Sequence, residues 1–198
     1  MSPQNPRSGH VPRGYKAPGP LPEGASERLA EFENLLRKWA PKLDLVAPGD
    51  LDRLAERHIE DSLRAVPLVD AIGAGPAVDV GSGGGLPGVP LALAARSRRW
   101  RFLEPRRRRA GFLEEVVREL DLEAEVVTMS AEEASGDDRY TDHSVAVARA
   151  LAPPAKAFAL LLPLLHPGGT AILWVGGSAK LPPDAALSSQ GLATMLKT

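Results

Sequence analysis

A glycine-rich segment carries the strongest chemical signal in this sequence. Segment 78–88 reads VDVGSGGGLPG and lies between a strand-like run, 77–80, and a helical run, 86–96. Ligands of parallel α/β sheets bind at the carboxyl ends of the strands, and glycine lets the backbone turn tightly and approach a ligand closely. We therefore predict that this segment binds a cofactor.

Two cofactor classes, the dinucleotides and S-adenosylmethionine (SAM), use a glycine loop in this position. Gly83, Gly85 and Gly88 satisfy the dinucleotide pattern GxGxxG. This match is weak evidence, because a glycine-rich segment satisfies many such patterns. Asp79 precedes Gly81 by two residues, which gives the Asp-x-Gly-x-Gly-x-Gly pattern of SAM-dependent methyltransferases. An acid there can accept hydrogen bonds near the cationic methionyl end, whereas it would repel a pyrophosphate. The register favours SAM over NAD and over a structural turn without a ligand.

Two further segments follow strand-like runs and could complete a nucleoside site. Glu104 ends the second run, and a carboxylate there can accept both ribose hydroxyls. Its alternative role is a surface glutamate at a strand end. Residues 130–133, Ser-Ala-Glu-Glu, follow the third run and could receive an adenine ring. The same four residues could equally open a helix.

The surrounding elements predict the fold that would position these residues. Strands separated by helices of this length imply parallel βαβ units. We expect an α/β fold with a doubly wound, mostly parallel sheet, Rossmann-like as in class I SAM-dependent methyltransferases. The predicted strands are 77–80, 100–103, 124–128, 144–148 and 170–175, and the predicted helices between them are 86–96, 107–120 and 155–165.

The remaining chain divides into three regions. Residues 1–24 hold six prolines and three basic side chains, so we predict a disordered, proline-rich basic tail. Residues 25–70 predict an N-terminal helical extension, with one helix from Ser26 to Pro41 and another from Asp50 to about residue 66. Residues 71–198 would form the SAM-binding core with a shortened C-terminal segment.

Composition excludes several classes of function. The chain has 198 residues, a net charge of −1, no cysteine, and four widely spaced histidines. We expect no disulfide and no metal site. No apolar run approaches the roughly 20 residues that span a bilayer, and no signal peptide is visible. A cytoplasmic protein, most simply a monomer, is the expectation.

With these residues placed, residues 29–176 resemble the RsmG (GidB) family of bacterial 16S rRNA guanine-N7 methyltransferases. The most specific matches are segment 79–91, DVGSGGGLPGVPL, and segment 57–63, RHIEDSL, which resembles the family's RHxxDSL helix. Arg149-Ala150 at the end of the fourth strand is the third match. Segments 109–113, 132–133 and 167–169 support them.

The resemblance implies an activity, a partner and a set of site residues. It implies methyl transfer from SAM to N7 of a guanine in the 16S rRNA of the small ribosomal subunit. Such a transfer needs no general base, because N7 has an unshared electron pair and no proton to lose. The resemblance implies SAM contacts at Gly81, Leu86, Ala131, Glu132 and Arg149. The glycine pattern and the strand ends add Asp79, Gly83 and Glu104 as predicted SAM contacts.

His58 and Asp61 lie three residues apart on a predicted helix, so they share a face. The resemblance favours positioning roles for them and Arg149 at the mouth of the active site. The alternative is a buried polar cluster that pins the helix to the core. Arg57 could pair with Asp61 at a spacing of four residues.

Seven arginines between positions 98 and 109 could bind RNA phosphates. We take Arg106, Arg107, Arg108 and Arg109 as the RNA-binding candidates beside the cofactor. The alternative is a solvated arginine face.

The chain departs from the family pattern at its end. Residues 174–176 read Trp-Val-Gly where the family has Leu-Lys-Gly, so a basic residue is missing. Only 22 residues follow Gly176, and 191–197 could form one strand. Two alternatives follow: a divergent member that binds SAM but methylates a small molecule or another RNA, and a non-catalytic ribosome-binding relative.

Overall fold

One seven-stranded sheet forms the centre of the molecule. The computed structural model describes residues 14–95, 98–189 and 191–198. The strand order is β3-β2-β1-β4-β5-β7-β6, with β1 to β5 parallel and the last two strands antiparallel. This order confirms the predicted doubly wound, mostly parallel sheet. The strands are β1 (Ala77–Val80), β2 (Trp100–Leu103), β3 (Ala124–Val127), β4 (His143–Arg149), β5 (Leu165–Trp174), β6 (Ala186–Leu187) and β7 (Leu192–Leu196).

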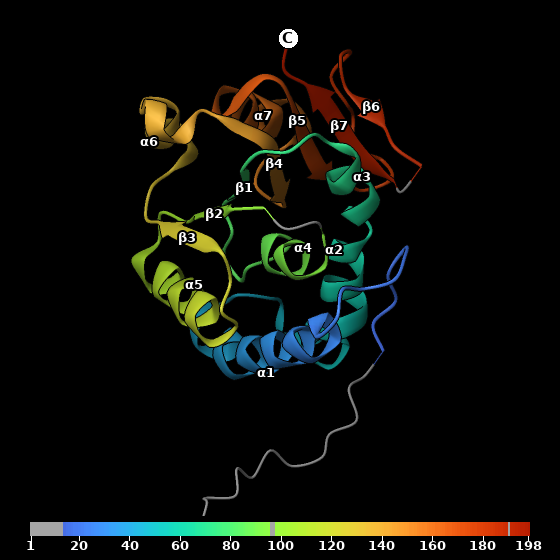
Figure 1. Ribbon diagram of the computed structural model, residues 1–198, viewed down its shortest axis with the longest axis vertical. Helices are drawn as coiled ribbons and strands as arrows, with labels where there is room; N and C mark the ends of the chain where they lie inside the picture. The colour runs from blue at the N-terminus through green and yellow to red at the C-terminus, as the bar shows by residue number, and fades with distance from the viewer. Residues whose placement is uncertain (1–13, 96–97, 190) are drawn as a thin grey trace, which may run out of the picture.

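Helices cover both faces of the sheet, and each face has its own apolar cluster. The first face packs against α1 (Ala25–Leu43), α4 (Gly88–Ala94) and α5 (Arg107–Glu119), with α1 lying alongside the other two (Figure 1). The second face packs against α6 (Ala131–Ser135) and α7 (Pro154–Leu161). Short helical turns η3 (Asp138–Tyr140) and η4 (Leu162–Leu164) precede β4 and β5.

The register of the parallel strands brings the predicted site residues to one edge. β1 lies between β2 and β4 and is buried along its whole length, as expected for a central parallel strand. Asp79 is opposite Val147 on β4, and Arg149, two residues further along, is opposite Trp174 on β5. Because side chains alternate along a strand, Asp79, Arg149 and Trp174 belong to the same face. That face carries the N-terminal helices.

The predicted second helix is a succession of short turns. Its place is taken by the 3₁₀ turn η1 (Pro48–Arg53), the π-helical turn η2 (Ala55–Glu60) and α2 (Asp61–Leu63). The helix α3 (Val66–Ala71) then starts one residue before Pro67, where the missing N–H is not needed. One continuous helix from residue 50 to 66 is therefore wrong.

Part of the predicted disordered tail packs onto the domain. Tyr15 is buried, and its hydroxyl donates a hydrogen bond to Glu33 Oε2 at 3.0 Å. Ala17 and Leu21 pack against the first apolar cluster. For residues 14–24 the expectation of disorder is corrected, because these three side chains give a proline-rich segment something to bury. Residues 1–13 lie outside the described part of the chain.

The C-terminal segment forms a hairpin on the sheet. β7 confirms the strand predicted at 191–197, and β6 pairs with it as a two-residue edge strand that the sequence did not predict. The predicted helix 86–96 is shorter as α4, and residue 96 lies outside the described ranges. No helix in those ranges is long and apolar enough to cross a membrane.

Candidate functional site

The glycine loop after β1 is fastened to the end of β2. The backbone N–H groups of Gly81 and Ser82 both donate to the carbonyl oxygen of Leu103, at 2.9 and 3.0 Å. Gly81 has a φ of 70°, and a Cβ there would lie 2.8 Å from the Leu151 side chain. Glycine is therefore favoured at this position by the positive φ, while the Leu151 side chain would have to shift to admit a Cβ.

Glu104 anchors this loop from the second strand. The side chain is buried, with Oε2 accepting from the Gly83 N–H and Oε1 from the Arg106 N–H, both at 2.9 Å. A carboxylate has about four lone-pair sites, so two accepted bonds leave it able to accept more. Glu104 both holds the loop and offers acceptor capacity to a ligand.

A cavity of about 390 Å³ lies at the carboxyl edge and joins four of the predicted cofactor residues. Gly81, Glu104, Ala131 and Glu132 all line it, although they come from three separate loops. A larger hollow of about 830 Å³, lined by Trp100 and the 18–22 segment among others, gathers none of the predicted residues. We therefore take the smaller cavity as the candidate cofactor site.

Other residues of this cavity were missed by the sequence reasoning. Met129, Leu151 and Leu160 give it apolar walls, and the exposed Lys156 on α7 adds a cation. Leu151 had a signal, because it directly follows the Arg149-Ala150 match. The α7 residues had none, because nothing in the sequence tells which side of that helix faces the loop edge.

Residues 130–133 open a helix, and three of them also line the cavity. Ser130 Oγ accepts a hydrogen bond from the Glu133 N–H, and Glu133 Oε2 accepts one from the Ser130 N–H. The two residues therefore form a capping box for α6. Glu132 is not used by the cap and lines the cavity together with Ser130. The start of α6 therefore forms part of the cavity wall.

Asp79 lies beneath the loop and does not line the cavity. Its Oδ2 accepts from the Gly88 N–H at 3.1 Å, while its fully buried Oδ1 has no hydrogen-bond partner among the described residues. Burial raises the pKa of Asp79 to about 7, against the opposing effect of the Gly88 bond. Gly83 and Leu86, also predicted as cofactor residues, lie outside the cavity lining as well.

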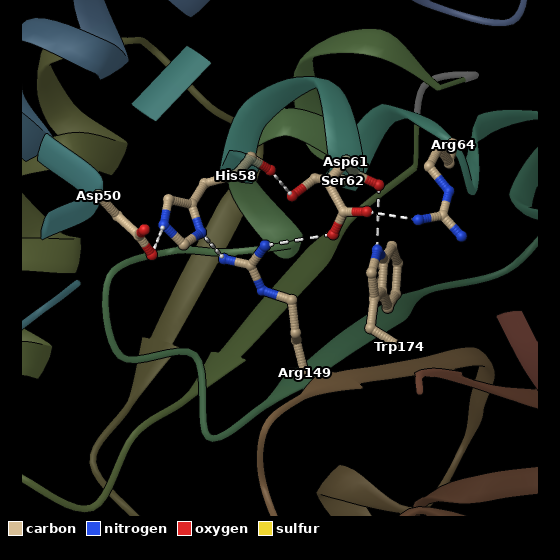
Figure 2. Close-up of polar contacts among 7 residues, drawn as sticks. All are labelled: Asp50, His58, Asp61, Ser62, Arg64, Arg149 and Trp174. Atoms are coloured by element: carbon tan, nitrogen blue, oxygen red, sulfur yellow. Dashed lines mark hydrogen bonds and ion pairs between the residues drawn. The ribbon is translucent and has the colours of Figure 1, made fainter. Parts of the chain in front are cut away.

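Arg149 reaches from the end of β4 to the N-terminal helices (Figure 2). Its Nη1 donates to Asp61 Oδ2 at 3.4 Å, and its Nη2 contacts His58 Nδ1 at 2.9 Å. The structure therefore brings His58, Asp61 and Arg149 together, as the sequence predicted. Desolvation lowers the pKa of Arg149, and the carboxylate of Asp61 opposes that shift. Arg149 does not line the cavity, although the adjacent Ala150 does.

His58 links Arg149 to a second carboxylate. Its Nε2 lies 3.0 Å from Asp50 Oδ2. Because a guanidinium can only donate, His58 Nδ1 must be the acceptor, and the neutral ring carries its proton on Nε2. Burial and the charge of Arg149 lower the pKa of His58, which favours this neutral form.

Asp61 and Arg57 do not pair as the sequence suggested. Arg57 donates to Asp50 Oδ1 at 2.6 Å, and Asp61 Oδ1 instead accepts from Arg64 at 2.5 Å. Both side chains therefore have other partners, and Asp61 Oδ2 in addition accepts from Arg149. The indole N–H of Trp174 donates to the Asp61 carbonyl oxygen at 3.0 Å (Figure 2).

The arginine-rich stretch divides between the two edges of the sheet. Arg98 and Arg99 precede β2, while the four candidates follow it, so the former lie a strand length away from the cofactor edge. Among the candidates, Arg109 donates to the carbonyl oxygens of Leu43 and Asp44 at 3.3 and 2.7 Å and thereby holds the end of α1. The exposed candidates are Arg106, Arg107 and Arg108, the last of which also contacts the Lys42 carbonyl.

No three histidine, aspartate or glutamate side chains within the described ranges are grouped so that they could hold a metal ion. Among the described residues, the site consists of a polar cluster around Arg149 and a partly apolar cavity beside it.

Comparison with known proteins identifies the family. The sequence profile described as rRNA small subunit methyltransferase G (GidB) matches residues 25–182. The chain belongs to this family. A relative from Frankia alni named ribosomal RNA small subunit methyltransferase G is 41% identical over 166 residues, which are 81% of this chain and 62% of the relative. A relative of the same name from Granulibacter bethesdensis is 36% identical over 154 residues, 78% of this chain and 70% of that protein.

The matched part of the chain spans between 55% and 76% of the lengths of the relatives compared, and 62% of the Frankia alni protein. A solved structure of a methyltransferase from Geobacter sulfurreducens has the same fold, with a TM-score of 0.56 and 13% identity over 90% of this chain and 98% of that one. The family match and the fold of this solved structure therefore agree with the doubly wound sheet.

Proposed function

We propose that this protein transfers the methyl group of SAM to N7 of a guanine in the 16S rRNA of the small ribosomal subunit. The observation that carries the proposal is the cavity at the carboxyl edge, which Gly81, Glu104, Ala131 and Glu132 line together. Family membership names the small-subunit rRNA of the relatives as the acceptor. The N7 position comes from the resemblance of the motifs.

The residues at the cavity fit SAM by their chemistry. Glu104 retains acceptor capacity that suits ribose hydroxyls. Met129, Leu151 and Leu160 offer apolar surface suited to an adenine ring. The partnerless Oδ1 of Asp79, beneath the glycine loop, is suited to a cationic methionyl end nearby. Gly83 and Leu86 would act from the loop backbone.

The protein's part in the reaction would be alignment and exclusion of water. When bound, SAM would supply an electrophilic methyl group on a sulfonium. Guanine N7 has an unshared pair, so the chain needs to provide no general base. The task left to Arg149, His58 and Asp61 is to fix the geometry at the end of β4, where a displacement of about 1 Å is costly.

We divide the chain by these tasks. Residues 71–198 would hold the cofactor, and residues 25–70 would supply the wall that faces the acceptor. The contacts that support this division are those of His58 and Asp61 with Arg149, which join the extension to β4.

The RNA would reach the site along a basic surface. Arg106, Arg107 and Arg108 are exposed beside the cavity, and Arg106 and Arg109 line it. Because the net charge is −1, RNA binding must depend on such a local patch rather than on the whole molecule. An enzyme of the ribosome would work in the cytoplasm, and nothing in the proposed reaction needs a second copy of the chain.

The strongest alternative is a family member that binds SAM but methylates a small molecule or another RNA. It is favoured by residues 174–176, which lack the lysine of the family pattern. A non-catalytic ribosome-binding relative is the second alternative.

The test is transfer of labelled methyl from SAM to small ribosomal subunits that lack the modification. Naked 16S rRNA and fully modified subunits serve as controls. The proposal expects label only in the unmodified subunits. Absence of label, with SAM binding established by calorimetry, would favour the alternative substrate. Absence of both would leave the non-catalytic relative.

A further inference from the structure

Aromatic surface available for stacking a nucleobase is scarce in this protein. The chain has nine aromatic residues, and all of them lie in the described ranges. The four phenylalanines, the two tyrosines and Trp100 are buried. Trp39 and Trp174 are the two rings that stay partly exposed.

Trp39 is a poor candidate for stacking. It lies on α1, and the ammonium groups of Lys38 and Lys42 lie 5.3 and 4.9 Å from its ring centroid. Its surroundings are helices α1 and α5 rather than the loops after β4 and β5, as the Lys38–Glu115 ion pair indicates. A base stacked there would have to displace both cations.

Trp174 lies where an acceptor would have to be. It is the last residue of β5 and the register partner of Arg149 on β4, so the two side chains stand next to each other at the carboxyl edge. Trp174 also lines a small cavity of about 170 Å³ that shares Ala150, Leu151 and Ala152 with the cofactor cavity. Residue 174 therefore borders a cavity next to the candidate cofactor site without lining that site itself.

The indole is held in a fixed orientation. Its N–H donates to the Asp61 carbonyl oxygen at 3.0 Å, and the Asp61 carboxylate in turn contacts Arg149 (Figure 2). The ring also packs against the first apolar cluster, so the surface left for a planar partner is its partly exposed part. An ordered ring also loses less conformational entropy when a base stacks on it.

We propose that Trp174 is an acceptor-binding residue on whose ring the target base stacks, beside Arg149. RNA enzymes that act on one base commonly receive it on aromatic rings or arginine planes. This inference rests on the proposed function. It gives the departure at residue 174 a role: a stacking surface where the family pattern has an aliphatic side chain.

The test compares Trp174→Leu, Trp174→Phe and the control Trp39→Leu in methyl transfer to unmodified subunits. Removing the ring should lower kcat/KM for the subunit by about tenfold or more, the effect of one lost base–aromatic stack. Trp174→Phe keeps a ring and should stay within about threefold of the wild type, although it loses the N–H. Trp39→Leu should leave kcat/KM unchanged, and calorimetry should find SAM affinity unchanged in all three.

The outcomes separate the inference from the proposed function. Label with the wild type but an unchanged kcat/KM in Trp174→Leu would overturn the inference alone. A Trp174→Phe variant as impaired as Trp174→Leu would also overturn it, because the N–H anchor rather than the ring would then matter. Absence of label with the wild type would overturn the proposed function, and this inference with it.

Discussion

Asp79 is fully buried at the end of β1, and one of its carboxylate oxygens has no hydrogen-bond partner among the described residues. Its pKa of about 7 means that the folded protein keeps the proton to a higher pH than the unfolded chain does. Stability should therefore fall as pH rises from about 4 to about 7. We interpret the carboxylate as a group kept for the cofactor at the expense of stability.

Replacing Asp79 with asparagine should remove this penalty. The amide oxygen can still accept from the Gly88 N–H, and no buried charge forms at high pH. We expect the free energy of unfolding at about pH 8 to rise by roughly 1–3 kcal/mol, while SAM binds more weakly. Urea denaturation at about pH 5.5 and 8 measures the first effect and calorimetry the second. The exposed Asp52→Asn is the control, and equal pH dependence of Asp79→Asn and the wild type would refute the interpretation.

His58 gives a second pH dependence of opposite sign. Its folded-state pKa lies below 6.5, so the unfolded chain binds the proton first as pH falls. Its contribution to stability is present above about pH 6.5 and is lost below it, when a proton on Nδ1 would face Arg149. His58→Gln should flatten this part of the profile.

The measurement is the difference in free energy of unfolding between the wild type and His58→Gln from about pH 7 to 5. Asp79 and the buried His143 titrate in both proteins, so the difference reports His58 alone. As pH falls, the free energy of unfolding of the wild type should decrease relative to that of His58→Gln. A difference that does not change with pH would show that His58 is not held neutral by Arg149.

Individual site residues could be predicted where strand ends and motifs coincide. Gly81, Glu104, Ala131 and Glu132 follow three different strands, and the parallel sheet brings them to one cavity. Asp79 could be placed on β1, but its neighbour Gly88 and its unpaired oxygen depend on how α4 packs. Pairing of Asp61 with Arg57 was wrong, because Arg57 pairs with Asp50 and Asp61 with Arg64, contacts that helical spacing alone does not display.

At the scale of elements, the arginines after β2 have two separable roles. Arg109 holds the C-terminal end of α1 through two backbone carbonyls, whereas Arg107 is exposed and begins α5. We expect Arg107→Glu to weaken rRNA binding at low salt, and to reduce the slope of log binding constant against log salt by about 1. The melting temperature and SAM affinity should stay unchanged.

Arg109→Glu should behave differently from its neighbour. It removes both bonds to α1 and brings a carboxylate to carbonyl oxygens, so it should lower the free energy of unfolding by about 1–3 kcal/mol. The same denaturation and RNA titrations check it. If both variants affected RNA binding alone, the structural role of Arg109 would be refuted; if neither affected RNA binding, the basic surface would be.

The order of the strands and helices after residue 77 was predictable from the sequence. The boundaries of the helical turns in the N-terminal extension were not. Alternating strands and helices after residue 77 have one short-connection solution, a doubly wound sheet. Residues 48–71 contain a 3₁₀ turn, a π-helical turn and two short α-helices, all of which share one helical pattern of apolar residues. The sequence displays neither these breaks nor the contacts of the segment with β4 and β5, such as that of Trp174 with Asp61.

At the scale of the molecule, the cofactor cavity and the polar cluster around Arg149 lie next to each other at the carboxyl edge of the sheet. The cofactor cavity belongs to the loops after the parallel strands, and the polar cluster joins the extension to β4 and β5. An acceptor lying between them would be reached by the methyl donor from one side and oriented by Arg149 and Trp174 from the other. The chain covers 62% of the Frankia alni relative, and all of these residues fall within the family match.

The most direct test is the chemical identity of the product. Unmodified small subunits are incubated with the protein and labelled SAM, the 16S rRNA is digested to nucleosides, and the label is located by mass spectrometry. The account predicts 7-methylguanosine as the sole labelled nucleoside, arising from one position. Label on any other nucleoside, or on ribosomal protein, would contradict it.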